Sequence, residues 1–257
     1  MIRTLPLLQT FCKECSKFTK NPNRIVQAVS IDAMGTLIAL AKPFDEVYSR
    51  VASEHGVDVS PAAIACGYAK LMNDVSESYP CFGYGSIGEY EWWKRIIVGS
   101  LQKAHTKRID HIQGDKISRQ LYDFYTTASA WRIIDPEMKS AVDVLRQMGL
   151  GVVVVSNFDS RLKKILRNLE IDHLFDLVLL SGEIGLEKPD PKIFEMVLGH
   201  YHLTSPSQLL HVGDNVKKDY QAAIKFGAKA FLFDPLSEKT EVDESHRIRS
   251  FSELTIE

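Results

Sequence analysis

The sequence predicts an α/β protein with a Rossmann-like parallel sheet as its core and a helical cap inserted after the first strand. After residue 24, apolar runs of strand length alternate with segments of helical periodicity, which is typical of a parallel sheet covered by helices. More than a hundred residues separate the first strand from the second, whereas a βαβ crossover needs only about thirty. A chain of 257 residues with 45% hydrophobic content is long enough for one large domain carrying such an insertion.

The first 24 residues differ in composition from the rest of the chain, because five basic residues and one acidic residue lie among scattered Ser and Thr. We interpret residues 1–24 as a poorly ordered extension of a cytoplasmic protein. A mitochondrial transit segment is the alternative, and a nuclear location stays open. Cys12 and Cys15 form a lone C-x-x-C, and without a second pair or a nearby His they predict no metal or redox site.

The core is predicted at residues 25–40 and 130–257, and its elements follow from apolar runs and helix signals. A continuous apolar run indicates a strand buried on both faces, and Gly149 and Gly151 separate one such run from the helix before it. Asp190 is a suitable N-cap and Pro191 a suitable first helical residue for another helix. We therefore expect strands at residues 25–31, 152–155, 177–180, 209–212 and 229–233, and helices at residues 136–148, 160–169, 191–198 and 217–226.

The cap is predicted at residues 41–129. Phe44, Val47, Tyr48 and Val51 lie on one face of a helix, and similar apolar patterns recur at residues 92–101 and 117–125. Residues 79–91 are rich in Gly, Ser and Tyr and indicate a loop inside the cap. A helical insertion at this position would cover the carboxyl edge of the sheet.

Composition restricts the classes of partner. A net charge of −2 and a pI of about 6.5 disfavour nucleic acid. No run approaches the length of a membrane-spanning segment, so we predict no membrane partner. Four cysteines in a chain this long indicate a reducing compartment rather than a disulfide framework. The expected partner is a small molecule, and the oligomeric state is left open.

Polar side chains end three of the predicted strands. Asp32 follows the first strand, Ser156 ends the strand that follows the cap, and Asp214 ends the strand LLHVG. Ligands of open α/β sheets bind at the carboxyl ends of the strands, so we expect one shared site at one edge of the sheet. A carboxylate there loses solvation and needs a cation or hydrogen bonds to offset the cost.

Four motifs in this order resemble those of the haloacid dehalogenase superfamily of hydrolases, over about residues 25–233. They are D-A-M-G-T from Asp32, S-N from Ser156, E-K-P around Lys188, and G-D-N-V-K-K-D, which holds Asp214 and Asp219. The phrases SNFDSRL and EYEWWKR are further similar to the subgroup of haloacid dehalogenase-like hydrolase domain-containing protein 3.

The resemblance implies a role for each motif residue. Asp32 is the nucleophile, Lys188 and Ser156 assist catalysis, and Ser156, Asn157 and Lys188 bind phosphate. Mg²⁺ is the implied cofactor, with Asp32, Asp214, Asp219 and the Met34 carbonyl as its ligands. These roles agree with elementary electrostatics, because two unit charges at 4 Å interact by roughly 4 kcal/mol at an effective dielectric near 20, so a cation must offset the repulsion between carboxylates and phosphate.

Met34 departs from the family pattern. Phosphatases of the superfamily usually carry a second Asp two residues after the nucleophile, and general acid–base help of this kind is worth about 10²- to 10⁴-fold in rate. Three interpretations follow: a Mg²⁺-dependent phosphatase of a small phosphate ester, a catalytically impaired binding protein, or a 2-haloacid dehalogenase. Dehalogenases of the superfamily also lack this acid, but they need no metal, and Asp214 and Asp219 speak against them.

Other polar and aromatic residues receive structural interpretations. Asp159 is expected to cap the helix that follows it, and Trp92 and Trp93 are expected to pack the cap. The eight histidines show no ligand spacing, so we predict no histidine in the site.

Overall fold

The computed structural model describes residues 18–256, and its centre is a six-stranded sheet in which every paired strand is parallel. The strands lie in the order β5-β4-β1-β6-β7-β8. Their bounds are β1 Ala28–Ile31, β4 Gly151–Ser156, β5 Leu177–Leu180, β6 Leu209–Gly213, β7 Lys229–Phe233 and β8 Arg247–Ile248. The chain adds strands first on the β4 side of β1 and then on the β6 side, which creates a topological switch point beside β1.

Alternating side chains of the strands pack against helices on opposite faces of the sheet. Val29 and Ile31 join one apolar cluster with α6 (Met138–Gln147) and α7 (Arg161–Asn168). Ala28 joins a second cluster with α9 (Lys192–His200) and α10 (Ala222–Phe226). The sheet is therefore buried on both sides, as the continuous apolar runs predict.

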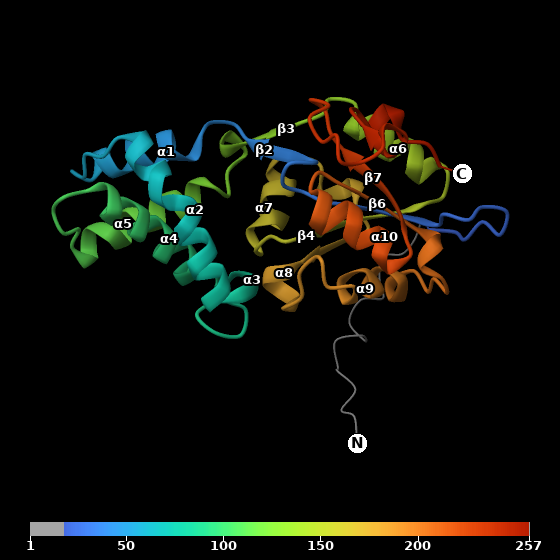
Figure 1. Cartoon of the computed structure of the whole chain (residues 1–257), viewed down its shortest axis with the longest axis horizontal. Coiled ribbons are helices and arrows are strands. Elements are labelled where there is room, and N and C mark those ends of the chain that lie inside the picture. The colour runs from blue at the N-terminus through green and yellow to red at the C-terminus, as the bar shows by residue number, and fades with distance from the viewer. Residues whose placement is uncertain (1–17, 257) are drawn as a thin grey trace, which may run out of the picture.

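The cap is a group of helices beside the core (Figure 1). It comprises α1 (Phe44–Glu54), α2 (Pro61–Ser78), α3 (Pro80–Gly83), α4 (Glu89–Ala104) and α5 (His111–Phe124). The apolar faces of α1, α4 and α5 form a separate buried cluster with part of α2. The long helix α2 is absent from the sequence prediction, although Ser60 caps it and Pro61 occupies its first position.

Core and cap are joined through a small antiparallel sheet that the sequence did not predict. It pairs β2 (Ile38–Leu40) with β3 (Trp131–Ile133), one strand from each connection between the two parts. Both strands lie where the chain passes between core and cap in Figure 1. Each has only three residues, too few to show a period-two pattern in the sequence.

Element bounds differ from the predictions mainly at the ends. The first strand begins at Ala28 rather than residue 25, whereas β5 and β7 begin and end as predicted. The predicted helix 217–226 divides into a π-helical segment, Val216–Gln221, and α10. The predicted loop 79–91 contains α3, and its last residues begin α4.

Short segments complete the structure: α8 (Ser181–Ile184) and 3₁₀ turns at Ala128–Ala130, Asp172–Leu174, Pro206–Gln208, Glu244–His246 and Phe251–Glu253.

The described end of the N-terminal extension contacts the core. The Phe18 ring lies 4.6 Å from the Tyr201 ring, and Lys20 donates a hydrogen bond to the His202 carbonyl. Arg24 donates to the Met148 carbonyl at 2.8 Å. The extension is thus fixed from residue 18 onward. Cys12 and Cys15 lie outside the described residues.

Among residues 18–256, no helix combines the length and the apolar character needed to cross a bilayer.

Candidate active site

The three polar strand ends lie together at the carboxyl edge of the sheet. Asp32 directly follows β1, which pairs with β4 on one side and with β6 on the other. Ser156 is the buried last residue of β4, and Asp214 directly follows β6. Asp32 and Asp214 therefore lie at the switch point, where the connections on the two sides leave a crevice.

Lys188 is the charged centre of the site. Its side chain is only 2% exposed, and Nζ lies 2.6 Å from Asp32 Oδ1 and 2.6 Å from Asp219 Oδ1. The third ammonium proton is used by the Val155 carbonyl at 2.8 Å, so all three donors have acceptors. Burial disfavours the charge, but the two carboxylates outweigh burial and raise the pKa of the Lys188 ammonium.

Asn157 fixes the backbone that carries Lys188. Its Nδ2 donates to the Lys188 carbonyl, and its Oδ1 accepts from the Lys188 N–H, both at 2.8 Å. The Asn157 amide is therefore committed to positioning Lys188. Any contact of Asn157 with phosphate would have to come from its backbone N–H.

Asp219 shares the Lys188 ammonium with Asp32 and accepts from a network of donors that includes a histidine. Its Oδ1 accepts from Lys188 and lies 3.1 Å from His211 Nε2, and its Oδ2 accepts from the Asn215 N–H at 2.9 Å. Burial favours the neutral acid, but Lys188 and His211 outweigh burial and lower the pKa of Asp219. Gly213 leaves the space for this carboxylate, because a Cβ there would lie 2.3 Å from Asp219 Cγ.

His211 is a residue of the site that the sequence prediction missed. Its Nδ1 lies 2.8 Å from Ser30 Oγ on β1, and burial lowers the pKa of the ring. In the neutral tautomer that satisfies both contacts, Ser30 donates to Nδ1 and Nε2 donates to Asp219. The available signal was a single polar ring in the otherwise apolar strand LLHVG.

Three carboxylates could hold a metal ion. Asp32, Asp214 and Asp219 each offer an oxygen, and these oxygens lie within 4.8 Å of one another. Hard carboxylate oxygens suit Mg²⁺, which keeps several waters and also binds substrate phosphate. Burial raises the pKa of Asp32 to about 6, and the Lys188 ammonium limits that rise. Burial also raises the pKa of Asp214.

A glycine allows the close approach of Asp214. Gly35 has a φ of +90°, and a Cβ at this position would lie 2.6 Å from Asp214 Oδ2. A second cation lies nearby, because Lys239 Nζ is 3.7 Å from the same oxygen and also donates to the Asp214 carbonyl.

Met34 occupies the turn between β1 and β2, and its side chain carries no group that can give or take a proton. The residue is 40% exposed and lines a cavity of about 250 Å³ between core and cap. Trp93 also lines this cavity, so it contacts the candidate substrate space in addition to packing the cap. The cavity wall is otherwise mostly apolar and aromatic: Leu40, Phe44, Tyr48, Tyr68, Met72, Phe82, Ile97, Tyr122, Tyr125, Trp131, Asn157, Phe158 and Arg161.

The two phrases that resemble the subgroup meet across the boundary between core and cap. Glu89 of EYEWWKR accepts hydrogen bonds from the N–H of Ser160 at 2.9 Å and from its hydroxyl at 2.6 Å. Trp93 Nε1 donates to Asp159 Oδ2 at 2.6 Å. Segments about seventy residues apart in the sequence thus join cap and core.

Asp159 is not the N-cap that the sequence predicts, because Ser160 occupies that position and makes no side-chain cap hydrogen bond. Asp159 accepts from the Arg161 N–H at 3.0 Å and also binds the Arg161 guanidinium through Nε and Nη2 at 2.8 and 2.6 Å. The guanidinium lies over the rings of Trp93 and Tyr122, 4.8 and 4.3 Å from their centroids. Arg161 is a second functional candidate that sequence reasoning missed.

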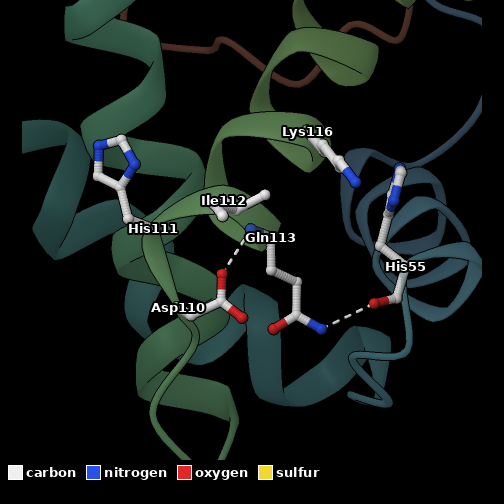
Figure 2. Close-up of a pocket in the computed structure, with 6 residues that line it drawn as sticks. All are labelled: His55, Asp110, His111, Ile112, Gln113 and Lys116. Atoms are coloured by element: carbon white, nitrogen blue, oxygen red, sulfur yellow. Dashed lines mark hydrogen bonds between the residues drawn. The ribbon is translucent and has the colours of Figure 1, made fainter.

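A larger cavity, of about 520 Å³, lies on the cap away from the carboxylates (Figure 2). Its polar groups are engaged in local structure, because Gln113 donates to the His55 carbonyl at 2.8 Å and Asp110 caps α5. His55 Nε2 lies 2.7 Å from Gln120, and His111 points away from His55 in Figure 2. The polar side chains that line this cavity therefore do not converge on one point, as those of an active site would.

Comparison with known proteins identifies relatives over most of the chain. The family model of haloacid dehalogenase-like hydrolases matches residues 26–227. The human haloacid dehalogenase-like hydrolase domain-containing protein 3 is 32% identical over 240 residues, which cover 89% of this chain and 92% of that protein.

Solved structures show that the fold serves more than one chemistry. An HAD phosphatase from Thermococcus onnurineus matches with a TM-score of 0.61 and 17% identity, covering 89% of this chain and 95% of its own. A 2-haloacid dehalogenase from Pseudomonas syringae pv. Tomato DC3000 matches with a TM-score of 0.65 and 18% identity, and the match covers 88% of this chain and 95% of the dehalogenase. At these identities the likeness is one of fold.

Proposed function

The chain belongs to the haloacid dehalogenase-like hydrolases, and from this premise we propose that it is a Mg²⁺-dependent phosphatase acting on a small phosphate monoester. The observation that carries the proposal is the convergence of carboxylate oxygens of Asp32, Asp214 and Asp219 within 4.8 Å of one another, with the buried ammonium of Lys188 between two of them. A nucleophile, a cation site and a fixed positive charge are what phosphoryl transfer to a carboxylate requires.

Asp32 is the proposed nucleophile. Its Oδ1 is held by Lys188, which leaves Oδ2 to attack phosphorus and form an aspartyl-phosphate. Lys188 neutralises charge on the transferring oxygens, while Asp219 and Asn157 keep it in place. The Ser156 hydroxyl, at the end of the neighbouring strand, would donate a hydrogen bond to a phosphate oxygen.

Mg²⁺ would be held by Asp32, Asp214 and the Met34 carbonyl, and Asp219 is a further carboxylate beside this site. Both oxygens of Asp219 already accept hydrogen bonds, so its main role in the proposal is to position the Lys188 ammonium. When bound, the ion would neutralise negative charge that phosphate and carboxylates bring together.

The proposed catalytic cycle lacks a residue that transfers protons. Met34 can neither protonate the departing alkoxide nor activate the water that attacks the aspartyl-phosphate. Substrates whose leaving group is stable as an anion are therefore favoured, and hydrolysis of the intermediate should be slow.

The direct experiment is a panel of phosphate esters and acyl phosphates assayed with and without Mg²⁺. We expect Mg²⁺-dependent phosphate release by the wild type, reduced to background by Asp32→Asn. Asp143→Asn, on the exposed side of α6, is the matched control and should retain full activity. Calorimetry should show Mg²⁺ binding that Asp214→Ala weakens strongly. Equal Mg²⁺ affinity of wild type and Asp214→Ala would exclude the proposed site.

The second candidate function is ligand binding without turnover, and Met34 is the observation that favours it. No release of phosphate from any ester, together with retained Mg²⁺ binding, would support this alternative. Dehalogenation has less support, because halide departure does not require the carboxylate set of Asp32, Asp214 and Asp219.

A further inference from the structure

The cavity between core and cap restricts what can be attached to the phosphate. Its volume of about 250 Å³ is slightly below the roughly 300–1,000 Å³ of pockets for drug-sized ligands, which limits the occupant to one or two rings. Met34, two residues after Asp32, and Asn157, next to Ser156, line it, so the cavity borders the two turns that carry the candidate site, although Asp32 itself is not among the lining residues. The cap wall contributes Phe44, Tyr48, Tyr68, Phe82 and Trp93, and the core wall contributes Phe158.

Aromatic walls on both sides favour a flat apolar occupant. Phe82 stacks against Trp93 at 6.2 Å and lies 6.4 Å from Phe158, so rings from both parts of the molecule border the same space. Such walls offer ring faces and edges to an arene, whereas most of their area offers no hydrogen-bond partner to the several hydroxyl groups of a sugar or glycerol.

Two of the residues that line the cavity carry a polar group with unused hydrogen-bonding capacity. The Tyr125 hydroxyl is buried and has no hydrogen-bond partner among the described residues, although buried hydroxyls normally have one. Arg161 uses Nε and Nη2 to bind Asp159, and Nη1 is the guanidinium nitrogen that this ion pair does not use. Both groups donate, so they suit an acceptor atom on the ring.

From these observations we infer that the cap cavity binds the aromatic leaving group of an aryl phosphate whose ring carries an oxygen acceptor. The assignment of a phosphate rests on the proposed phosphatase function, whereas binding of the arene does not. In the first step a bond forms between Asp32 Oδ2 and phosphorus, and the bond from phosphorus to the aryl oxygen breaks. The aryl oxygen keeps the electron pair and leaves as a phenolate.

A phenolate is stable enough to depart without a proton from the enzyme, and solvent protonates it afterwards. In the second step water attacks phosphorus, the bond from phosphorus to Asp32 breaks, and inorganic phosphate leaves with the proton lost to solvent. Met34 is then compatible with the first step, because no general acid is needed there.

The arene site can be tested without any turnover. We expect calorimetry to show saturable binding of 2-naphthol to the full chain and no binding of glycerol. Met72→Trp fills the cavity and should weaken 2-naphthol binding at least about tenfold, since it excludes the burial of one ring. Asn73→Trp, the exposed neighbour on α2, is the matched control and should bind like the wild type. Tyr125→Phe should weaken binding of 6-methoxy-2-naphthol, whose methoxy oxygen is the acceptor on the ring, and leave binding of 2-naphthol unchanged.

Turnover then tests the substrate class. The wild type should favour 2-naphthyl phosphate over glycerol phosphate by about 10²-fold or more in kcat/KM. The part of this preference that comes from the stable phenolate should survive in Met72→Trp, whereas the KM for 2-naphthyl phosphate should rise about tenfold and the KM for glycerol phosphate should not change. Absence of 2-naphthol binding, or equal binding by Met72→Trp and Asn73→Trp, would overturn the arene site. Binding of 2-naphthol without hydrolysis of any phosphate would retain the arene site and overturn only the phosphatase function.

Discussion

Lys188 determines the charge balance at the scale of single residues. Its ammonium faces the buried carboxylates of Asp32 and Asp219. The side-chain amide of Asn157 bonds to the backbone of Lys188 and so fixes the residue that carries this ammonium. The sequence placed Asp32, Ser156, Lys188 and Asp214 at one edge because parallel strands end there. It could not place Asn157 on the Lys188 backbone or His211 on Asp219, since these contacts depend on loop geometry and on which face of β6 His211 occupies.

Replacing Lys188 should cost both stability and activity. Lys188→Met leaves two buried carboxylates without a cation, and removing one partner of a buried ion pair typically destabilises by about 3–5 kcal/mol. We expect urea denaturation to show a loss of that size and phosphate release to fall to background. Lys192→Met, exposed on α9, is the control and should change neither quantity. Wild-type stability of Lys188→Met would contradict the charge balance proposed for the site.

Restoring the missing acid should change the substrate range. Met34→Asp is expected to raise turnover of alkyl phosphates by up to about 10²-fold, because an alkoxide leaves poorly without a proton. The gain should be much smaller for p-nitrophenyl phosphate, whose leaving group is already a stable anion. Met34→Asn has the same size without the acid and should gain nothing. Efficient hydrolysis of alkyl phosphates by the wild type would show that another residue supplies the proton.

At the scale of elements, five of the six strands of the core sheet were predictable, whereas the two-residue strand β8 and the parts that join core to cap were not. β5 and β7 follow from short apolar runs bounded by polar residues, and α1 follows from one apolar face. The helix α2 was missed although Ile64, Tyr68, Met72 and Val75 recur at helical spacing and pack in the cap. Small residues dominate its first two turns, which weakens the contrast between its apolar and polar faces. β2 and β3 pair with each other across the whole cap, and such pairing is not visible in either segment alone.

The contact between α4 and the loop before α7 is expected to hold the cap against the core. Glu89 accepts from Ser160 twice and from the Tyr122 hydroxyl of α5 at 2.6 Å, so Glu89→Ala removes two hydrogen bonds across the boundary and one within the cap. We expect faster hydrogen exchange at the Ser160 amide and a higher KM for phosphate esters, with the fold retained. Glu91→Ala removes only an exposed pair with Arg95 and should leave both unchanged. Unaltered exchange at Ser160 in Glu89→Ala would show that the boundary is held by other contacts.

At the scale of the whole molecule, the described end of the N-terminal extension belongs to the packed structure. Composition alone separates residues 1–24 from the α/β pattern, and it does not reveal that Phe18 lies on Tyr201 or that Lys20 bonds the His202 carbonyl. These contacts join the extension to the loop after α9, on the face of the sheet opposite α6 and α7. Removal of residues 1–22 should therefore lower the stability of the core.

A pair of truncations isolates these contacts. A chain without residues 1–22 should melt a few degrees below a chain without residues 1–17, because about 1 kcal/mol corresponds to roughly 2–4 °C in a protein of this size. Scanning calorimetry of the two truncated proteins measures the difference. Identical melting temperatures would show that Phe18 and Lys20 contribute nothing to stability.

The central claim is that Asp32 carries the phosphoryl group, and acid-quench mass spectrometry of the reacting enzyme tests it most directly. Because Met34 cannot activate water, the aspartyl-phosphate should accumulate when the full chain is mixed with Mg²⁺ and 2-naphthyl phosphate. We predict that the peptide containing Asp32 gains the mass of one phosphoryl group, that Asp32→Asn gains none, and that Met34→Asp shows less label during faster turnover. Steady release of phosphate with no label on Asp32 at saturating substrate, or a label on another residue, would contradict the account.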